Sequence, residues 1–402
     1  MTTSDKPRFA ILGAGPTGLE AALTAADGGF PFTVYEAAPG VAGNVRAWGH
    51  VRLFTPWEMN VSPRMRRHLA AAGIETPDGA ECPTGRELAE RLFAPLAGLP
   101  EIAPHLRLGT RVLGIGREGL LKHEEISTTE RGRRPFRLLL TDETGREWTE
   151  TADLVIDATG TWENPNTLGD AGIPAPGERA FGSEIRRDIP DFAREASAWV
   201  GKTVLLAGAG HSAQTAAREL AKLAQDAPGT EVIWLLRNPA PSWGTHPGDP
   251  LPERAGLAAT AAELAAGASP AVGVRRGAVV EEISKPNGRF HVVLRNGSKP
   301  ETVAVDRILS LTGAVGDHGI YRQLQVHECY ATCGPIKLSG ALLGAGSSDC
   351  LTQTTHGADT LTNPEPGFFI LGSKSYGRNN TFLMRIGWEQ VGEVFGLLDS
   401  WQ

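Results

Sequence analysis

The chain has 402 residues, 41% of them hydrophobic and 21% charged, and a formal net charge of −7, which is ordinary for a globular protein of two or three domains. The acidic balance, without any basic block, argues against nucleic acid as a partner, and no apolar run is long enough to span a bilayer. The first residues carry no apolar signal segment and four cysteines cannot build a disulfide framework, so the sequence predicts a protein of the reducing cytoplasm.

The first elements predicted along the chain form a dinucleotide-binding turn. Phe9–Leu12 is a short apolar run typical of a buried strand, and residues 16–26 have the spacing of a helix. Between them, Gly13 allows a tight turn, Gly15 lets the backbone approach a pyrophosphate, and Gly18 lets the helix pack against the strand.

The start of this helix and the strand that follows complete the motif. Pro16 and Thr17 lie at the helix N-terminus, whose N–H groups and positive dipole end can face phosphates. Phe32–Tyr35 is predicted as the next strand, and Glu36 at its end can accept hydrogen bonds from a ribose diol. Because strand, turn, helix and acid occur in this order, the sequence predicts nucleotide binding rather than a plain glycine-rich loop.

Small and basic residues follow this motif. Gly43 and Asn44 lie in a loop that can wrap a pyrophosphate, and Arg46, His50 and Arg52 lie just beyond it. One interpretation is that a member of this basic group faces a cofactor or a substrate carboxylate, which makes His50 and Arg52 candidate catalytic residues. The alternative is that the group consists of surface charges and one satisfied core histidine.

The rest of the first half is predicted as two helices, an antiparallel meander and a returning apolar strand. Ser62-Pro63 and a capping box that begins at Thr84 mark the starts of the helices. The apolar strand ends in Ala158-Thr159-Gly160. The predicted elements are residues 64–72, 87–96, 111–115, 136–141, 147–151 and 153–160.

A second dinucleotide-binding turn occurs in the middle of the chain. It lies between a predicted strand at residues 202–207 and an Ala-rich helix at residues 212–223, and the next strand is predicted at residues 231–236. Alanine stands in the third glycine position, which the motif tolerates. The turn contains Gly208, Gly210, His211, Ser212 and Ala213.

The residue after the next strand is Arg237 rather than an acid. An acid there would repel a 2′-phosphate, whereas a guanidinium can pair with it through two hydrogen bonds. The sequence therefore favours NADPH over NADH at this second site. The alternative is that Arg237 is an ordinary solvated surface charge, because its spacing from the turn is longer than usual.

The second half then repeats the architecture of the first. Its meander is predicted at residues 278–283, 289–295 and 302–305, its apolar strand at residues 306–313, and the linkers at residues 163–179 and 238–253. The predicted fold class is α/β, with two Rossmann-like dinucleotide-binding domains, each with an antiparallel meander, and the second inserted in the first. The expected domains are residues 1–165, 166–305 and 306–402, the last of which should return to the first.

These features resemble the flavoproteins with two dinucleotide-binding domains, a superfamily that contains flavin-containing, Baeyer–Villiger and N-hydroxylating monooxygenases and thioredoxin reductase-like enzymes. The resemblance covers nearly the whole chain and is carried by both turns, by Glu36 and Arg237, and by the stretch from Ala158 to Pro165. It implies FAD at the first turn and NADPH at the second. The residues assigned to cofactors on this basis are Gly13, Gly15, Pro16, Thr17, Gly18, Glu36, Gly43, Asn44, Arg46, Val112, Ala158, Thr159, Gly160, Gly372, Ser373, Thr381 and Phe382 for FAD, and Gly208, Gly210, His211, Ser212, Ala213 and Arg237 for NADPH.

The chain also departs from the family pattern. The long fingerprint of the flavin-containing monooxygenases and the Baeyer–Villiger signature are both missing, and Gly372-Ser373 stands where reductases carry the Gly-Asp that holds the flavin ribityl chain. In the tail, a helix is expected from Thr381 to about Leu398. By the resemblance, the start of this helix would face the flavin and stabilise the negative charge that collects on it during reduction.

The cysteines do not form the pairs that a flavin disulfide reductase uses. Neither Cys-x-x-Cys nor Cys-x4-Cys occurs, whereas Cys329 and Cys333 are separated by three residues and follow His327. Three interpretations of this segment are open: a metal cluster, a redox-active pair, or plain packing in a loop beside the flavin pocket. A reactive thiolate at Cys329, activated by His327, is the hypothesis that makes Cys329 a candidate catalytic residue.

By the resemblance, we expect an FAD-containing, NADPH-dependent monooxygenase that uses O₂ and a C4a-(hydro)peroxyflavin to oxygenate a small molecule. One alternative is a flavin-dependent disulfide or quinone reductase, and another is an FAD-binding redox sensor whose second nucleotide site is degenerate. The expected partners are a small-molecule substrate and O₂, without nucleic acid, membrane or metal, and a homodimer is left open.

Overall fold

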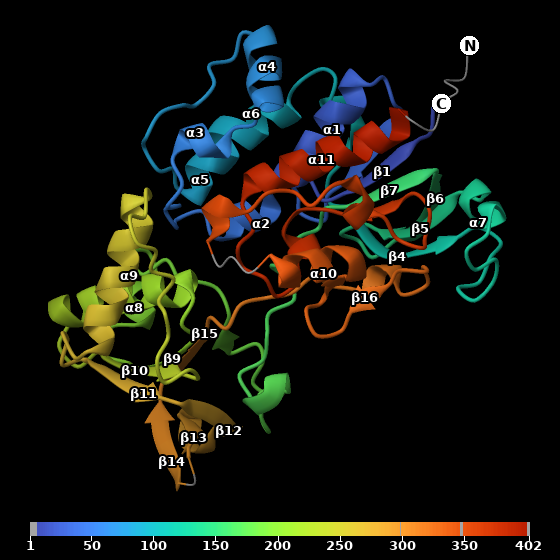
Figure 1. The fold of residues 1–402 in the computed structure, drawn as a ribbon. Helices are drawn as coiled ribbons and strands as arrows, with labels where there is room; N and C mark the ends of the chain where they lie inside the picture. The colour runs from blue at the N-terminus through green and yellow to red at the C-terminus, as the bar shows by residue number, and fades with distance from the viewer. Residues whose placement is uncertain (1–5, 298, 346–348, 400–402) are drawn as a thin grey trace. The chain divides into compact units, whose positions relative to one another are not determined.

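The computed structural model describes residues 6–297, 299–345 and 349–399. These divide into two compact units, each built around its own parallel sheet (Figure 1). Unit 1 comprises Met1–Asn164 and Val315–Gln402, and unit 2 comprises Pro165–Ala314, so the second unit is inserted in the first. No helix of the described residues is long and apolar enough to cross a membrane.

The parallel sheet of unit 1 has the strand order β18-β7-β1-β2-β3. The strands are β1 (Phe9–Leu12), β2 (Phe32–Tyr35), β3 (Leu106–Arg107), β7 (Leu154–Asp157) and β18 (Phe368–Ile370). Every residue of β1, β7 and β18 is buried, as expected for a parallel sheet that is covered on both faces.

Two helices, α1 (Pro16–Asp27) and α11 (Met384–Asp399), pack side by side in unit 1 (Figure 1). Phe395 of α11 stacks on Phe9 of β1, with ring centroids 4.8 Å apart. The C-terminal segment thus returns to the first sheet.

The other elements of unit 1 are short helices, a meander and a hairpin. The expected helix at residues 87–96 is interrupted by a π-helical turn at Ala89–Phe93, whereas its capping box, Thr84 with Glu87, is present. The helices are α2 (Gly43–Ala47), α3 (Trp57–Asn60), α4 (Pro63–Ala71), α5 (Gly85–Leu88), α6 (Ala94–Ala97), α7 (Thr129–Arg133) and α10 (Ile336–Gly344). The strands are β4 (Arg111–Arg117), β5 (Phe136–Thr141) and β6 (Glu147–Ala152) of the antiparallel meander, and β16 (Glu328–Cys329) and β17 (Gly334–Pro335) of the hairpin.

Unit 2 has a parallel sheet of order β11-β10-β9-β15-β8 and an antiparallel meander of its own. Its sheet strands are β8 (Ile185–Arg186), β9 (Thr203–Ala207), β10 (Glu231–Leu236), β11 (Val272–Arg276) and β15 (Arg307–Ser310). Its meander is β12 (Ala278–Ser284), β13 (Phe290–Asn296) and β14 (Lys299–Val305), and its helices are α8 (His211–Asp226) and α9 (Pro252–Ala265).

Two expected boundaries in unit 2 differ from the structure. The boundary placed at Val305 falls inside the unit, because β15 pairs in parallel with β9 and so completes the second sheet. The predicted linker at residues 238–253 overlaps the start of α9, which begins at Pro252. Proline is well suited to the first turn of a helix, where its missing N–H has no intrahelical partner to lose.

Candidate functional site

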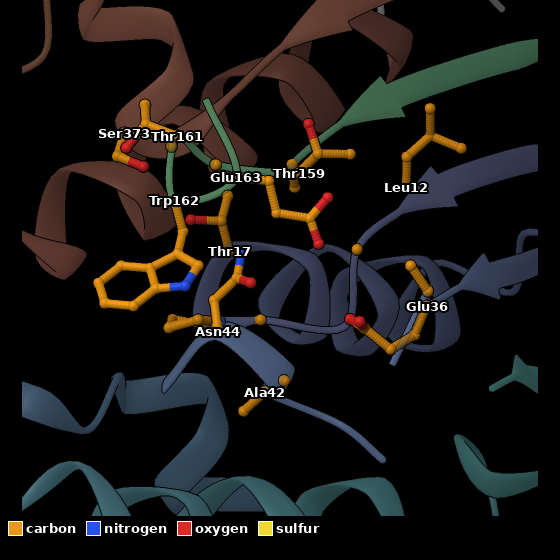
Figure 2. A pocket seen from close by; sticks show the side chains of 18 of the residues that line it. Leu12, Thr17, Glu36, Ala42, Asn44, Thr159, Thr161, Trp162, Glu163 and Ser373 are labelled. Carbon is orange, nitrogen blue, oxygen red and sulfur yellow. The ribbon is translucent and has the colours of Figure 1, made fainter. Parts of the chain in front are cut away.

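A pocket with a volume of about 320 Å³ lies in unit 1, at the carboxyl ends of β1, β2 and β7 (Figure 2). In open parallel sheets this edge is where ligands bind. Most of the residues assigned to FAD from the sequence line it. They are Gly13, Gly15, Pro16, Thr17, Glu36, Gly43, Asn44, Val112, Ala158, Thr159, Gly160, Gly372, Ser373 and Phe382.

The three glycines of the first turn meet different demands. Gly13 has a φ of +93°, and a Cβ there would lie 2.8 Å from the carbonyl oxygen of Ala158. A Cβ on Gly18 would lie 1.8 Å from the carbonyl oxygen of Gly13, so α1 packs directly on the turn and Gly18 serves the fold without lining the pocket. A Cβ on Gly15 would meet no heavy atom within 4 Å, and its φ of −83° suits any residue. Packing therefore explains Gly13 and Gly18, and it leaves Gly15 to be explained by a ligand.

The carboxylate of Glu36 is held at the rim of the turn. Its two oxygens accept hydrogen bonds from the N–H of Ala14 at 2.7 Å and from the N–H of Ala38 at 2.9 Å. Burial raises the pKa of Glu36 in spite of these bonds, and nearby Glu163 adds to the rise. A diol that donates hydrogen bonds to this carboxylate would compensate its desolvation.

A buried ion pair fixes the loop that follows β7. The ammonium group of Lys374 lies 2.6 Å from the carboxylate of Asp157, and both side chains are fully buried. Asp157 also accepts hydrogen bonds from the backbone N–H and the hydroxyl of Thr159, at 3.1 and 2.7 Å, and Lys374 donates to the same hydroxyl at 3.2 Å. The pair thus orients Thr159, which lines the pocket. The sequence analysis assigned no role to Asp157 or Lys374. The one available signal was the position of Lys374 directly after the predicted cofactor-binding residues Gly372 and Ser373.

Polar and aromatic residues that the sequence analysis did not assign complete the lining. Arg111 and Glu163 form a two-point ion pair, at 2.7 and 3.2 Å, with half-exposed side chains. Trp162 lies on the side of the pocket away from Glu36, together with Asn44 (Figure 2). These residues could contact a long ligand such as a dinucleotide at points beyond the turn.

Besides Gly18, five residues of unit 1 that the sequence analysis proposed as cofactor-binding or catalytic do not line this pocket. Arg46 donates to the carbonyl oxygen of Val41 at 3.1 Å, Arg52 donates to the carbonyl oxygen of Cys82, and Nε2 of His50 is buried without a partner among the described residues. Thr381 donates to the side chain of Asn379, before α11 begins at Met384. Cys329 lies on the hairpin β16–β17. The roles predicted for these residues stay predictions.

The turn of unit 2 follows the same pattern as the first. Gly208 has a φ of +128°, and a Cβ there would lie 2.2 Å from the carbonyl oxygen of Leu311 and 3.2 Å from the buried Cβ of Ala213. A Cβ on Gly210 would meet nothing within 4 Å, and α8 begins immediately afterwards with His211 and Ser212. The space beside Gly210 is thus open, and it lies at a helix N-terminus, where backbone N–H groups can bind a phosphate. Arg237 follows β10 and is exposed.

The segment after Arg237 folds against this turn rather than forming an open linker. The Trp243 ring lies 5.3 Å from that of Trp234, whose indole N–H donates to the carbonyl oxygen of Gly208 at 2.8 Å. The Gln214 amide donates to the carbonyl oxygen of Trp243 at 3.1 Å. Burial lowers the pKa of His211, and the nearby positive charges lower it further. Through these contacts Trp243 packs beside the second turn and the first turn of α8, although it lies 29 residues beyond Gln214 in the sequence.

The comparisons with known proteins place the chain among nucleotide-dependent oxidoreductases. A family model described as pyridine nucleotide-disulphide oxidoreductase matches residues 7–329. No curated protein matches the chain in sequence.

Three examples illustrate the solved structures that match almost the entire chain. The bacillithiol disulfide reductase Bdr (YpdA) from Bacillus cereus has a TM-score of 0.67 and 18% identity, covering 99% of this chain and all of its own. DfoA from Erwinia amylovora, the cadaverine monooxygenase of desferrioxamine biosynthesis solved with FAD, has a TM-score of 0.63 and 13% identity over 98% and 94% of the two chains. The thioredoxin reductase from Lactococcus lactis has a TM-score of 0.60 and 16% identity over 98% of each chain. At these identities the likeness shows the fold, and it confirms the predicted α/β class.

Proposed function

The chain belongs to the pyridine nucleotide-disulphide oxidoreductase family, which confirms the resemblance drawn from its sequence, and we propose that it is a monooxygenase that uses FAD, NADPH and O₂ on a small molecule. The family makes it a flavin-dependent oxidoreductase with FAD and NADP(H) as cofactors. Its structural neighbours include disulfide reductases and monooxygenases, so the choice between them rests on the residues of this chain.

The observation that carries the FAD site is the open space beside Gly15. The fold does not require glycine there, whereas a pyrophosphate that approaches the backbone does. The amide groups at the start of α1 would hold the phosphates, and Glu36 would accept hydrogen bonds from the adenosine ribose. FAD bound in this way would take up hydride from a nicotinamide and pass the electrons on.

Unit 2 supplies the nucleotide turn proposed for NADPH. Gly210 and the N-terminus of α8 would contact the pyrophosphate, and exposed Arg237 would pair with the 2′-phosphate. The desolvated imidazole of His211 favours its neutral form, so it would add no fixed charge beside the nicotinamide nucleotide.

The position of the cysteines favours oxygen chemistry over disulfide reduction at the flavin. A flavin disulfide reductase needs a dithiol that reaches the flavin, but no cysteine is among the residues that line the described pocket. All four cysteines of the sequence lie outside unit 2. What the pocket offers instead is apolar and aromatic surface from Trp162, Phe382 and Met384, which can exclude water from a reactive site.

Incorporation of labelled oxygen tests the proposal. The FAD-loaded protein is given NADPH, ¹⁸O₂ and a panel of amines, sulfides and ketones, and we expect one of these classes to gain a single labelled oxygen atom. In parallel, NADPH oxidation is followed without oxygen in the presence of disulfides or quinones. Rapid anaerobic turnover with one of these acceptors, together with no labelled product, would identify a reductase and contradict the proposal.

A further inference from the structure

Two segments that are distant in the sequence line the end of the flavin pocket beside Glu36. The N–H of Thr110 donates to the carbonyl oxygen of Glu36 at 2.8 Å, which sets the start of β4 beside this residue. Val112 of β4 lines the pocket, and so do Asp317 and Ile320 from the chain after the inserted unit. Val112 and Ile320 also pack against the same apolar cluster. Since the proposed site gives Glu36 the adenosine ribose, the base joined to that ribose would lie against these residues.

The carboxylate of Asp317 presents a hydrogen-bond acceptor at this end of the pocket. Its Oδ1 accepts from the N–H of Gly319 at 2.7 Å, which leaves Oδ2 to accept from a ligand. The hydrogen bond to Glu163 raises the pKa of Arg111 in spite of partial burial. The charges of Glu36 and Asp317 raise it further, so both carboxylates lie near this guanidinium. A ligand that reaches Asp317 must therefore offer a donor.

The backbone just before Asp317 is fixed by unit 1. The amide of Asn164 donates to the carbonyl oxygen of Gly316 at 3.1 Å. A Cβ on Gly316 would lie 2.4 Å from Cγ of the buried Lys374, so the chain passes directly over this side chain. Asp317 therefore follows a segment that has little room to shift.

A single carboxylate fixes the backbone after Asp317. Oε1 of Glu328, on β16, accepts a hydrogen bond from the hydroxyl of Tyr321 at 2.6 Å and lies 2.5 Å from Nδ1 of His318. The Tyr321 ring is buried and packs on Phe368 of β18, with ring centroids 5.2 Å apart. Partial burial would raise the pKa of Glu328, but the hydrogen bonds from His318 and Tyr321 outweigh it and lower this pKa. Glu328 thus ties both ends of the short turn that carries Ile320.

From this geometry we infer that Asp317 selects the base of the bound dinucleotide by accepting a hydrogen bond from the amino group of adenine, and that Glu328 is a positioning residue for this contact. The inference rests on the proposed FAD site. The amino group at C6 of adenine donates, whereas hypoxanthine carries at C6 an oxygen that can only accept. The carboxylate therefore attracts the first base and repels the second. Val112 and Ile320 would give either base the same apolar contact.

Competition binding to the full-length apoprotein tests the selection. ADP or inosine diphosphate (IDP) displaces FAD, and flavin fluorescence reports the displacement. In the wild type ADP should bind more tightly than IDP by roughly ten- to a hundredfold, the effect of one charge-assisted hydrogen bond. Asp317→Asn keeps an oxygen for Gly319 and turns an NH₂ donor to the base, so the preference for ADP should be lost or reversed. Glu118→Gln, which changes an exposed carboxylate paired with Arg137, is the control and should keep the preference.

Two changes at Glu328 test its positioning role. Glu328→Gln keeps an acceptor for the Tyr321 hydroxyl and should keep most of the preference for ADP, whereas Glu328→Ala should lose most of it. The preference is a ratio of two affinities in one variant, so a general loss of stability, which weakens ADP and IDP alike, leaves it unchanged. An unchanged ratio in Glu328→Ala would thus overturn the positioning role.

The selection itself fails on either of two results. One is equal binding of ADP and IDP to the wild type, and the other is a full preference for ADP in Asp317→Asn. Either result, with FAD still bound by the wild type, would leave the FAD site standing. An apoprotein that binds none of FAD, ADP and IDP would instead contradict the FAD site and this inference with it.

Discussion

Replacing Gly15 by valine tests the flavin site without disturbing the packing of the protein. A side chain at this position has open space around it, and the φ of −83° imposes no strain. The valine would therefore stand in the pocket at the point where we place the FAD pyrophosphate. The variant should fold and yet bind FAD more weakly.

The size of the effect follows from the contacts that would be lost. One charge-assisted hydrogen bond between a backbone N–H and a phosphate oxygen contributes about 1.5–3 kcal/mol. Its loss would raise the FAD dissociation constant by roughly ten- to a hundredfold. The free energy of unfolding of the apoprotein should not fall, and Gly15→Ala should raise it by about 0.4–1 kcal/mol because the unfolded chain loses conformational freedom.

Flavin fluorescence during titration of the apoprotein with FAD gives the dissociation constant, and denaturant unfolding gives the stability. Gly13→Ala is the matched control, because its Cβ would lie 2.8 Å from the carbonyl oxygen of Ala158 at a φ of +93°. This control should lose stability as well as FAD. An unchanged dissociation constant in folded Gly15→Val would refute the placement of the pyrophosphate, and unfolding as severe as that of Gly13→Ala would refute the packing argument.

Three other predictions follow from single side chains. Arg237→Ala should raise the NADPH Michaelis constant for flavin reduction by roughly ten- to a hundredfold and leave NADH almost unchanged, and equal weakening of both coenzymes would count against the 2′-phosphate contact. Lys374→Met should lower the free energy of unfolding by about 3–5 kcal/mol, because it leaves the buried carboxylate of Asp157 without its partner, and an unchanged urea midpoint would show that the pair is dispensable. Burial raises the pKa of Tyr376 to about 12 from its ordinary value of 10.0, so the folded protein keeps this proton longer than the unfolded chain. Stability should therefore fall between these two pH values, by less in Tyr376→Phe than in the wild type, and identical pH profiles of unfolding would contradict this.

The turns could be predicted from the sequence because their signals are local. The fingerprint from Gly13 to Glu36 spans one strand, one helix and one more strand, and each element has its own periodicity. The structure adds what a motif cannot give, namely that Gly13 and Gly18 serve the fold while Gly15 is open to a ligand. Most meander strands could be predicted in the same way, because short turns join β5 to β6, β12 to β13 and β13 to β14.

The rest of the site depends on residues that only the fold brings together. Asp157 and Lys374 both belong to unit 1, but the whole inserted unit lies between them in the sequence, and no spacing rule connects them. The pairing of Arg111, at the start of the meander strand β4, with Glu163, in the segment after β7, is of the same kind. The predicted linker at residues 238–253 is rich in Pro and Gly, but its residue Trp243 contacts Trp234, so this segment packs against the second turn. Tertiary contacts decided these features, so local composition could not reveal them.

Anaerobic mixing of the FAD-loaded protein with NADPH tests the central claim most directly. If unit 1 binds FAD and unit 2 binds NADPH in one working oxidoreductase, the flavin absorbance should bleach with NADPH as the hydride donor, and more slowly with NADH because Arg237 has no phosphate to contact. A protein whose bound flavin is reduced by neither coenzyme would contradict the account and would instead fit an FAD-binding sensor with a degenerate second site.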